Sequence, residues 1–110
     1  MAERLPGLTH IDLVGVEAVT SGAVETLASK CRELEYINLS GCSNVSDVTL
    51  GKIAEHCPKL EELRVWGCEN VTAAGVTEIA LKCSKLKTVR CSIGNKASLT
   101  RVFPHVSWNY

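Results

Sequence analysis

The chain has 110 residues, of which 45% are hydrophobic and 22% are charged, and its 12 basic residues balance its 12 acidic ones. This composition predicts one globular domain and excludes a largely disordered chain. The balanced charge argues against a protein built mainly to bind nucleic acid, which needs an excess of Lys and Arg. No apolar run approaches the roughly 18 residues of a membrane-spanning helix. The first six residues resemble neither a signal peptide nor a basic transit peptide.

The cysteines reveal a repeat. Cys31, Cys57 and Cys83 recur at one constant interval, and the same interval separates Cys42 from Cys68. A disulfide-bonded secreted protein has no reason to keep such a period, whereas stacked supersecondary units require one. The period divides the chain into four units and a tail, at about 5–30, 31–56, 57–82, 83–103 and 104–110.

The first half of each unit predicts a short strand. Apolar and polar residues alternate around Ile11 and Leu13, which is the period of a strand with one buried face. The same alternation recurs around Ile37, Leu63 and Val89. In three units a glycine that is expected to form a turn follows the strand at the same repeat position: Gly15, Gly41 and Gly67.

The second half of the first three units predicts a helix. Val24, Leu27 and Ala28 are spaced as neighbours on one helical face, and this spacing recurs from Leu50 and from Val76. Residues that favour the N-cap position precede each helix: Thr20-Ser21, Ser46-Asp47 and Thr72. Each unit is therefore expected to read strand, turn, helix, and the units must stack to bury their apolar faces.

The fourth unit departs from the repeat after Cys91. A short helix is expected over 98–102, because Leu99 and Val102 are apolar and Pro104 ends the segment. The apolar residues that follow are expected to cap the end of the stack: Phe103, Val106 and Trp108. The alternative is a docking tail that presents Trp108 and Tyr110 to another protein.

The repeated pattern Cys-x-x-Leu-x-x-Leu-x-Leu-x-x-Cys-x-x-Val-Ser/Thr resembles the cysteine-containing subtype of leucine-rich repeat over residues 5–91. This subtype is best known from F-box/LRR proteins, the substrate receptors of SCF ubiquitin ligases. The resemblance implies an α/β leucine-rich-repeat solenoid, a short horseshoe of about four 26-residue strand-turn-helix units forming a single domain over 1–110. It also implies protein–protein recognition without catalysis. We expect no F-box ahead of the first unit, because only four residues precede it.

The cysteines are expected to be buried thiols. Stacked units place Cys31, Cys57 and Cys83 in one ladder and Cys42 and Cys68 in another, where free Cys packs as a small apolar residue. A ladder does not converge on one point as four zinc ligands must, so no metal and no cofactor are expected. Free thiols indicate a reducing intracellular compartment, cytoplasmic or nuclear; a mitochondrial location stays open, although no transit peptide is seen.

Residues between the strand leucines are expected to face outward on the concave surface of the sheet. Tyr, Trp and Arg, which dominate binding hot spots, are among them. Trp66 is interpreted as a partner anchor or as a cover over small neighbours. Arg64 and Arg90 either take one carboxylate or phosphate together or pair with Glu62 or Asp12. The candidate partner-binding residues are His10, Asp12, Tyr36, Asn38, Glu62, Arg64, Trp66 and Arg90.

Two further features bear on function. His10 and Asp12 share a surface, but a regular sheet offers no cleft for a catalytic triad, so no catalytic residue is expected. Residues 1–81 hold all 12 acids and six bases, whereas residues 82–110 hold six bases and no acid. This asymmetry is interpreted either as a C-terminal end that attracts anions or as drift over a small number of charged residues. The alternative to a recognition module is a small structural subunit, held in a larger complex by its ends and its tail.

Overall fold

The computed structural model describes residues 7–15, 20–92 and 96–109, in which strands and helices alternate along the chain. Strands β1 to β5 cover His10–Asp12, Tyr36–Asn38, Glu62–Arg64, Thr88–Arg90 and Ser107–Asn109. Helices α1 to α4 cover Ser21–Lys30, Asp47–His56, Ala73–Lys82 and Lys96–Val102. The predicted α/β class is confirmed, and strands alternate with helices as expected.

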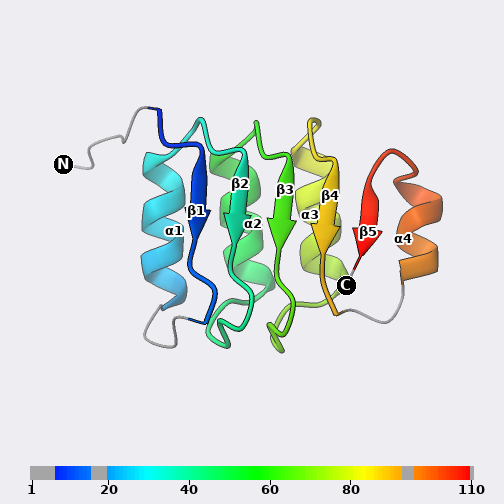
Figure 1. Ribbon diagram of the computed structural model, residues 1–110, viewed down its shortest axis with the longest axis horizontal. Coiled ribbons are helices and arrows are strands. Elements are labelled where there is room, and N and C mark those ends of the chain that lie inside the picture. Colours follow the sequence, from blue (N-terminus) through cyan, green and yellow to red (C-terminus); the bar gives the residue numbers. More distant parts are fainter. Residues whose placement is uncertain (1–6, 16–19, 93–95, 110) are drawn as a thin grey trace.

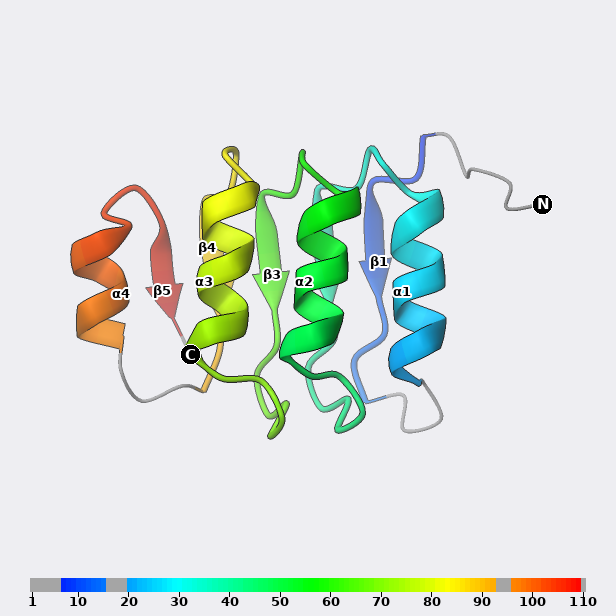
Figure 2. The same cartoon turned by 180° about the vertical axis from the view of Figure 1, so that it is seen from behind.

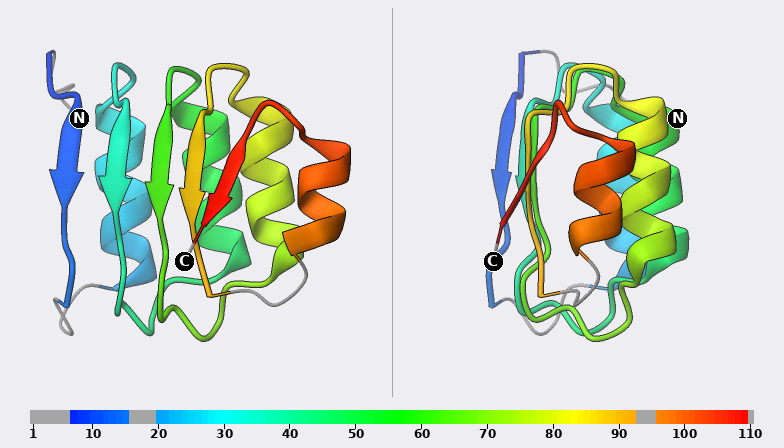
Figure 3. Two further views of the ribbon diagram at one scale, coloured as in Figure 1. Left: turned by 45° about the vertical axis from the view of Figure 1, so that its right-hand side comes forward. Right: turned by 90° about the vertical axis from the view of Figure 1, so that its right-hand side faces the viewer.

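The strands form one parallel sheet in the order β1-β2-β3-β4-β5, so each strand lies beside the next one in the chain (Figure 1). The helices form a single layer on one face of this sheet, as Figures 2 and 3 show from behind and from the side. The opposite face, called here the open sheet face, is covered by none of the described helices. No helix in the described ranges is long and apolar enough to cross a membrane.

The register of the sheet follows the sequence period. His10 pairs with Tyr36, Tyr36 with Glu62 and Glu62 with Thr88, so each partner lies one full repeat further along the chain. Side chains on alternate strand positions therefore stand in columns that run across the sheet, with successive members about 4.8 Å apart. The next pairing, of Thr88 with Ser107, breaks the period.

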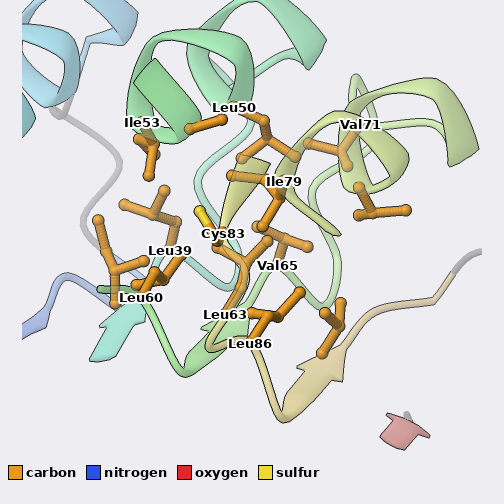
Figure 4. Packing of buried hydrophobic residues seen from close by; sticks show 14 of the residues in the cluster. Leu39, Leu50, Ile53, Leu60, Leu63, Val65, Val71, Ile79, Cys83 and Leu86 are labelled. Carbon is orange, nitrogen blue, oxygen red and sulfur yellow. The ribbon is translucent and has the colours of Figure 1, made fainter. Parts of the chain in front are cut away.

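The core lies between the sheet and the helices (Figure 4). Strand residues such as Ile37 and Leu63 meet helix residues such as Leu50, Ile53 and Ile79, and each of these is at most 1% exposed. Burying a side chain of this size contributes about 1.5–3 kcal/mol. One continuous core therefore joins the units, as the stacking argument requires.

All six cysteines are buried free thiols. The Cys57 Sγ donates to the carbonyl of Cys31 at 3.5 Å, and the Cys83 Sγ donates to the carbonyl of Cys57 at 3.4 Å. In the second ladder the Cys68 Sγ donates to the carbonyl of Leu39 at 3.0 Å. Cysteine thus fills a small apolar space and satisfies a carbonyl of the preceding unit. Burial raises the pKa of Cys57 to about 12 and that of Cys83 to about 11.

Turns and helix starts form where the sequence predicts them. Gly15, Gly41 and Gly67 have φ values of 71°, 80° and 76°, a left-handed conformation that favours glycine. Thr20, Ser46 and Thr72 occupy the N-cap positions of α1, α2 and α3. The Thr20 Oγ1, for example, accepts a hydrogen bond from the amide of Ala23 at 3.1 Å. These caps fix where each helix begins on the sheet.

The end of the chain closes the core. Phe103, Val106 and Trp108 are all buried, as expected of a cap. The Trp108 Nε1 donates to the carbonyl of Phe103 at 3.4 Å, and the centroids of the two rings are 6.1 Å apart. Trp108 lies in β5, whose pairing with β4 was not predicted. Its burial fits the expected cap better than the alternative of a docking tail, and Tyr110 lies outside the described residues.

Candidate interaction surface

The open sheet face carries three columns of side chains. The register places Tyr36 between His10 and Glu62 in the first column, and Arg64 beside Arg90 in the second. The third column follows the strands, where the amide of Gly41 donates to the carbonyl of Trp66 at 2.9 Å. Seven of the eight candidate residues stand in the first two columns, and the structure brings them together on one surface. Trp66 stands in the third.

Aromatic and charged side chains on this face stack on one another. The His10 and Tyr36 rings are stacked, with centroids 5.4 Å apart and planes 24° from parallel. The Arg64 guanidinium carbon lies 5.3 Å from the centroid of the Tyr36 ring, within the range of a cation–π contact. The Arg64 Nε also donates to the Glu62 Oε2, and this hydrogen bond raises the pKa of Arg64. The charged head of Arg64 is therefore held in position by contacts within this face.

Trp66 and two arginines surround a shallow hollow. The hollow has a volume of about 320 Å³ and is lined by Val14, Asn38, Ser40, Arg64, Trp66 and Arg90. Trp66 is 55% exposed, and its backbone amide donates to the Ser40 Oγ at 3.1 Å. Arg64 and Arg90 occupy paired positions on β3 and β4. An exposed indole beside two cations suits a ligand that joins an apolar group to an anionic one.

Asn38 differs from the other candidates. It is only 7% exposed. Its Oδ1 accepts the amide of Ser40 at 3.0 Å, and its Nδ2 donates to the Tyr36 hydroxyl at 3.4 Å. These bonds hold the chain just after β2 and the hydroxyl of Tyr36, so Asn38 acts chiefly within the surface. Its place among the candidate partner-binding residues stays a prediction.

Two lining residues were absent from the candidate set. Val14 and Ser40 share the column of Trp66, and the repeat alone places them there. Their residue types gave no signal, because Val and Ser are common on any protein surface. Among the described residues, no group of three or more His, Cys, Asp or Glu is placed to hold a metal ion.

No protein-family model matches the chain, and no curated protein is similar enough in sequence to count as its relative. The function proposed below is therefore drawn from the repeat and from the geometry of the open sheet face.

Proposed function

We propose that the chain is a leucine-rich-repeat protein of the cysteine-containing subtype, a short horseshoe-shaped solenoid that binds a protein partner on its open sheet face without catalysing a reaction. The sequence period supports this proposal, because the paired residues of the first four strands are separated by one repeat at every step. In this proposal the chain is similar to the substrate-recognition part of an F-box/LRR protein of an SCF ubiquitin ligase.

The observation that carries the proposal is the exposed cluster of Arg64, Trp66 and Arg90 around the hollow. Trp and Arg supply most of the binding energy in many interfaces. A single acidic side chain, a chain-terminal carboxylate or a phosphate would bridge the two guanidinium groups. The stack of Arg64 on Tyr36 lowers the entropy lost on binding, because one of the two cations is already ordered. The proposed ligand is a protein segment with an apolar side chain next to an anionic group.

The second candidate is a structural subunit of a larger complex, held by the ends of the solenoid and by the C-terminal tail. The burial of Trp108 removes one of the two tail residues on which this candidate depended. The strands β1 and β5 lie at the two ends of the sheet, and each is paired on one side within the described residues. Because this candidate places its contacts at these ends, it is tested together with the first.

Affinity capture from a cell lysate distinguishes the two candidates. The wild-type chain is compared with Arg64→Glu/Trp66→Ala and with a matched control on the helical side, Lys52→Glu/Val48→Ala. Val48 is 67% exposed and Lys52 is exposed, so the control also replaces one apolar and one basic surface side chain. Circular dichroism checks that each variant folds.

We expect a protein partner that the wild-type chain and the control capture and the sheet-face variant loses. Capture of the same proteins by all three chains would contradict recognition on the open sheet face. It would favour the structural subunit, because the ends of the solenoid are unchanged in every variant.

A further inference from the structure

A second surface feature lies on the helical side, between α3 and α4. Neighbouring helices α1 and α2, and α2 and α3, pack closely, whereas α3 and α4 lack such packing in the described part of the chain. Figures 1 and 2 show α4 set apart from α3 at the end of the helix layer. The helix α4 has seven residues where α3 has ten, so it fills less of the space beside its neighbour.

This gap is an apolar groove, called here the α3–α4 groove. It has a volume of about 210 Å³ and is lined by Ala73, Thr77, Ser98, Leu99, Val102 and Phe103. Leu99 and Phe103 are buried and belong to the core, whereas Val102 is 66% exposed. The groove thus offers an apolar floor and an exposed apolar wall.

Leu81 is an exposed apolar residue of α3 that lies beyond the lining residues of the groove. It is 66% exposed and comes four residues after Thr77, which places the two side chains on the same side of the helix. The repeat shows that a leucine is unusual at this position, because the equivalent residues of the first two units are Ser29 and Glu55. Helix α3 therefore exposes an apolar residue at the position where α1 and α2 carry polar ones.

None of the residues that line the α3–α4 groove is charged, but the segment that contains α4 is basic. From residue 82 onward the sequence has six basic residues and no acidic one. Lys82 ends α3 but lines the hollow between α2 and α3. Arg101 lies in the last turn of α4, and the two helices run in the same direction, so Arg101 and the end of α3 lie toward the same end of the groove. Lys82 pairs with Glu78 at 3.0 Å. Lys85 and Arg101 are exposed, and both belong to the segment 82–110, which contains no acidic residue. A partner that complements this charge is acidic.

We propose that the α3–α4 groove is a docking surface for an acidic segment of another protein, which inserts an apolar side chain between α3 and α4. The apolar floor binds the inserted side chain, and Lys85 and Arg101 attract the acids that flank it. This surface lies on the helical side of the sheet, opposite the open sheet face, and so adds a second partner site to the proposed function without depending on it.

The test is a selection of binding peptides from a random linear peptide library displayed on phage, with the full chain immobilised. We expect the enriched peptides to combine Asp or Glu with a large apolar residue. Their affinity should fall about tenfold for Leu81→Glu and for Arg101→Glu. It should stay unchanged for two controls: Val48→Glu, a similarly exposed apolar position on α2, and Arg64→Glu/Trp66→Ala on the open sheet face.

Several results would overturn the proposal. They are the absence of enriched peptides, enrichment of peptides without acids, and affinity that falls with Arg64→Glu/Trp66→Ala but not with the groove variants. The last result would leave the proposed function standing while removing the groove. Self-association of the wild-type chain in sedimentation, abolished by Leu81→Glu, would show that a second copy occupies the groove and would also refute an acidic partner segment.

Discussion

Replacement of Gly75 by alanine should set the helix preference for alanine against the clash of a new methyl group with a neighbouring helix. Gly75 lies in α3 against Asp47 of α2, and a Cβ added to it would lie 2.3 Å from the Asp47 Oδ1 and 3.1 Å from the Asp47 Cα. The Asp47 carboxylate cannot simply yield, because it accepts hydrogen bonds from the Thr72 amide at 2.8 Å and from the Thr72 Oγ1. The new methyl group must break this link between the starts of α2 and α3.

The expected change in the free energy of unfolding combines a gain in helix preference with a loss of hydrogen bonds. Alanine is favoured over glycine in a helix by about 1 kcal/mol. Two hydrogen bonds to a carboxylate at an exposed site contribute about 1 kcal/mol each once water can replace them. Gly75→Ala should therefore lower the free energy of unfolding by about 1 kcal/mol. Gly51→Ala is the matched control, because no atom lies within 4 Å of its added Cβ, and it should raise the free energy of unfolding by up to about 1 kcal/mol.

Urea unfolding followed by circular dichroism measures both variants. The expected difference between them is about 2 kcal/mol. Gly75→Ala should cost less in the Asp47→Ala background than in the wild type, because the clash with the carboxylate is gone and only the 3.1 Å approach to the Cα of residue 47 remains. Equal stability of Gly75→Ala and Gly51→Ala would refute the contact between Gly75 and Asp47 as a constraint on how the helices pack.

Three further outcomes are expected. Trp108→Ala should lower the free energy of unfolding by about 3–5 kcal/mol, because it empties part of the core, whereas Trp66→Ala should change it by less than about 0.5 kcal/mol; equal losses in urea unfolding would contradict the placement of Trp108. The six buried thiols should resist N-ethylmaleimide in the folded protein and all react in urea, as mass spectrometry would show; rapid labelling of the folded chain would contradict their burial. The pKa values of Cys57 and Cys83 are raised in the folded state to about 12 and about 11 from an ordinary 9.0, so the unfolded chain loses these protons first. The contribution of these thiols to the free energy of unfolding should therefore be fully present below pH 9 and decrease above it, by about 1.4 kcal/mol per pH unit for each thiol. In Cys57→Ala the free energy of unfolding should decrease less steeply with pH, and an unchanged slope would count against the raised pKa.

Much of the fold could be predicted because the repeat is regular. A single period placed the first four strands, the turn glycines and the N-caps of three helices. The strand β5 escaped prediction because the segment between Thr88 and its partner Ser107 is shorter than one repeat. Its sequence, Ser-Trp-Asn, is too short to show a strand pattern of its own.

The surface was less predictable than the backbone. The columns follow from strand alternation, so the neighbours of Arg64 were known from the sequence. Its partners were not, because the choice between Glu62 and Asp12 depends on side-chain rotamers. The structure pairs it with Glu62 and stacks it on Tyr36. The burial of Asn38 could not be predicted either, because it depends on how the side chains of the neighbouring columns cover it.

Partner binding on the open sheet face is tested most directly by site-specific crosslinking in a cell lysate. Photoreactive p-benzoylphenylalanine replaces Thr88, which stands between Glu62 and Ser107 on that face, or Val48 on the helical side. The proposed function predicts a crosslinked protein from position 88 that disappears when Arg64→Glu is added, and no crosslink to that protein from position 48. A partner that crosslinks from position 48 alone, or that still crosslinks from position 88 after Arg64→Glu/Trp66→Ala, would contradict recognition through this surface.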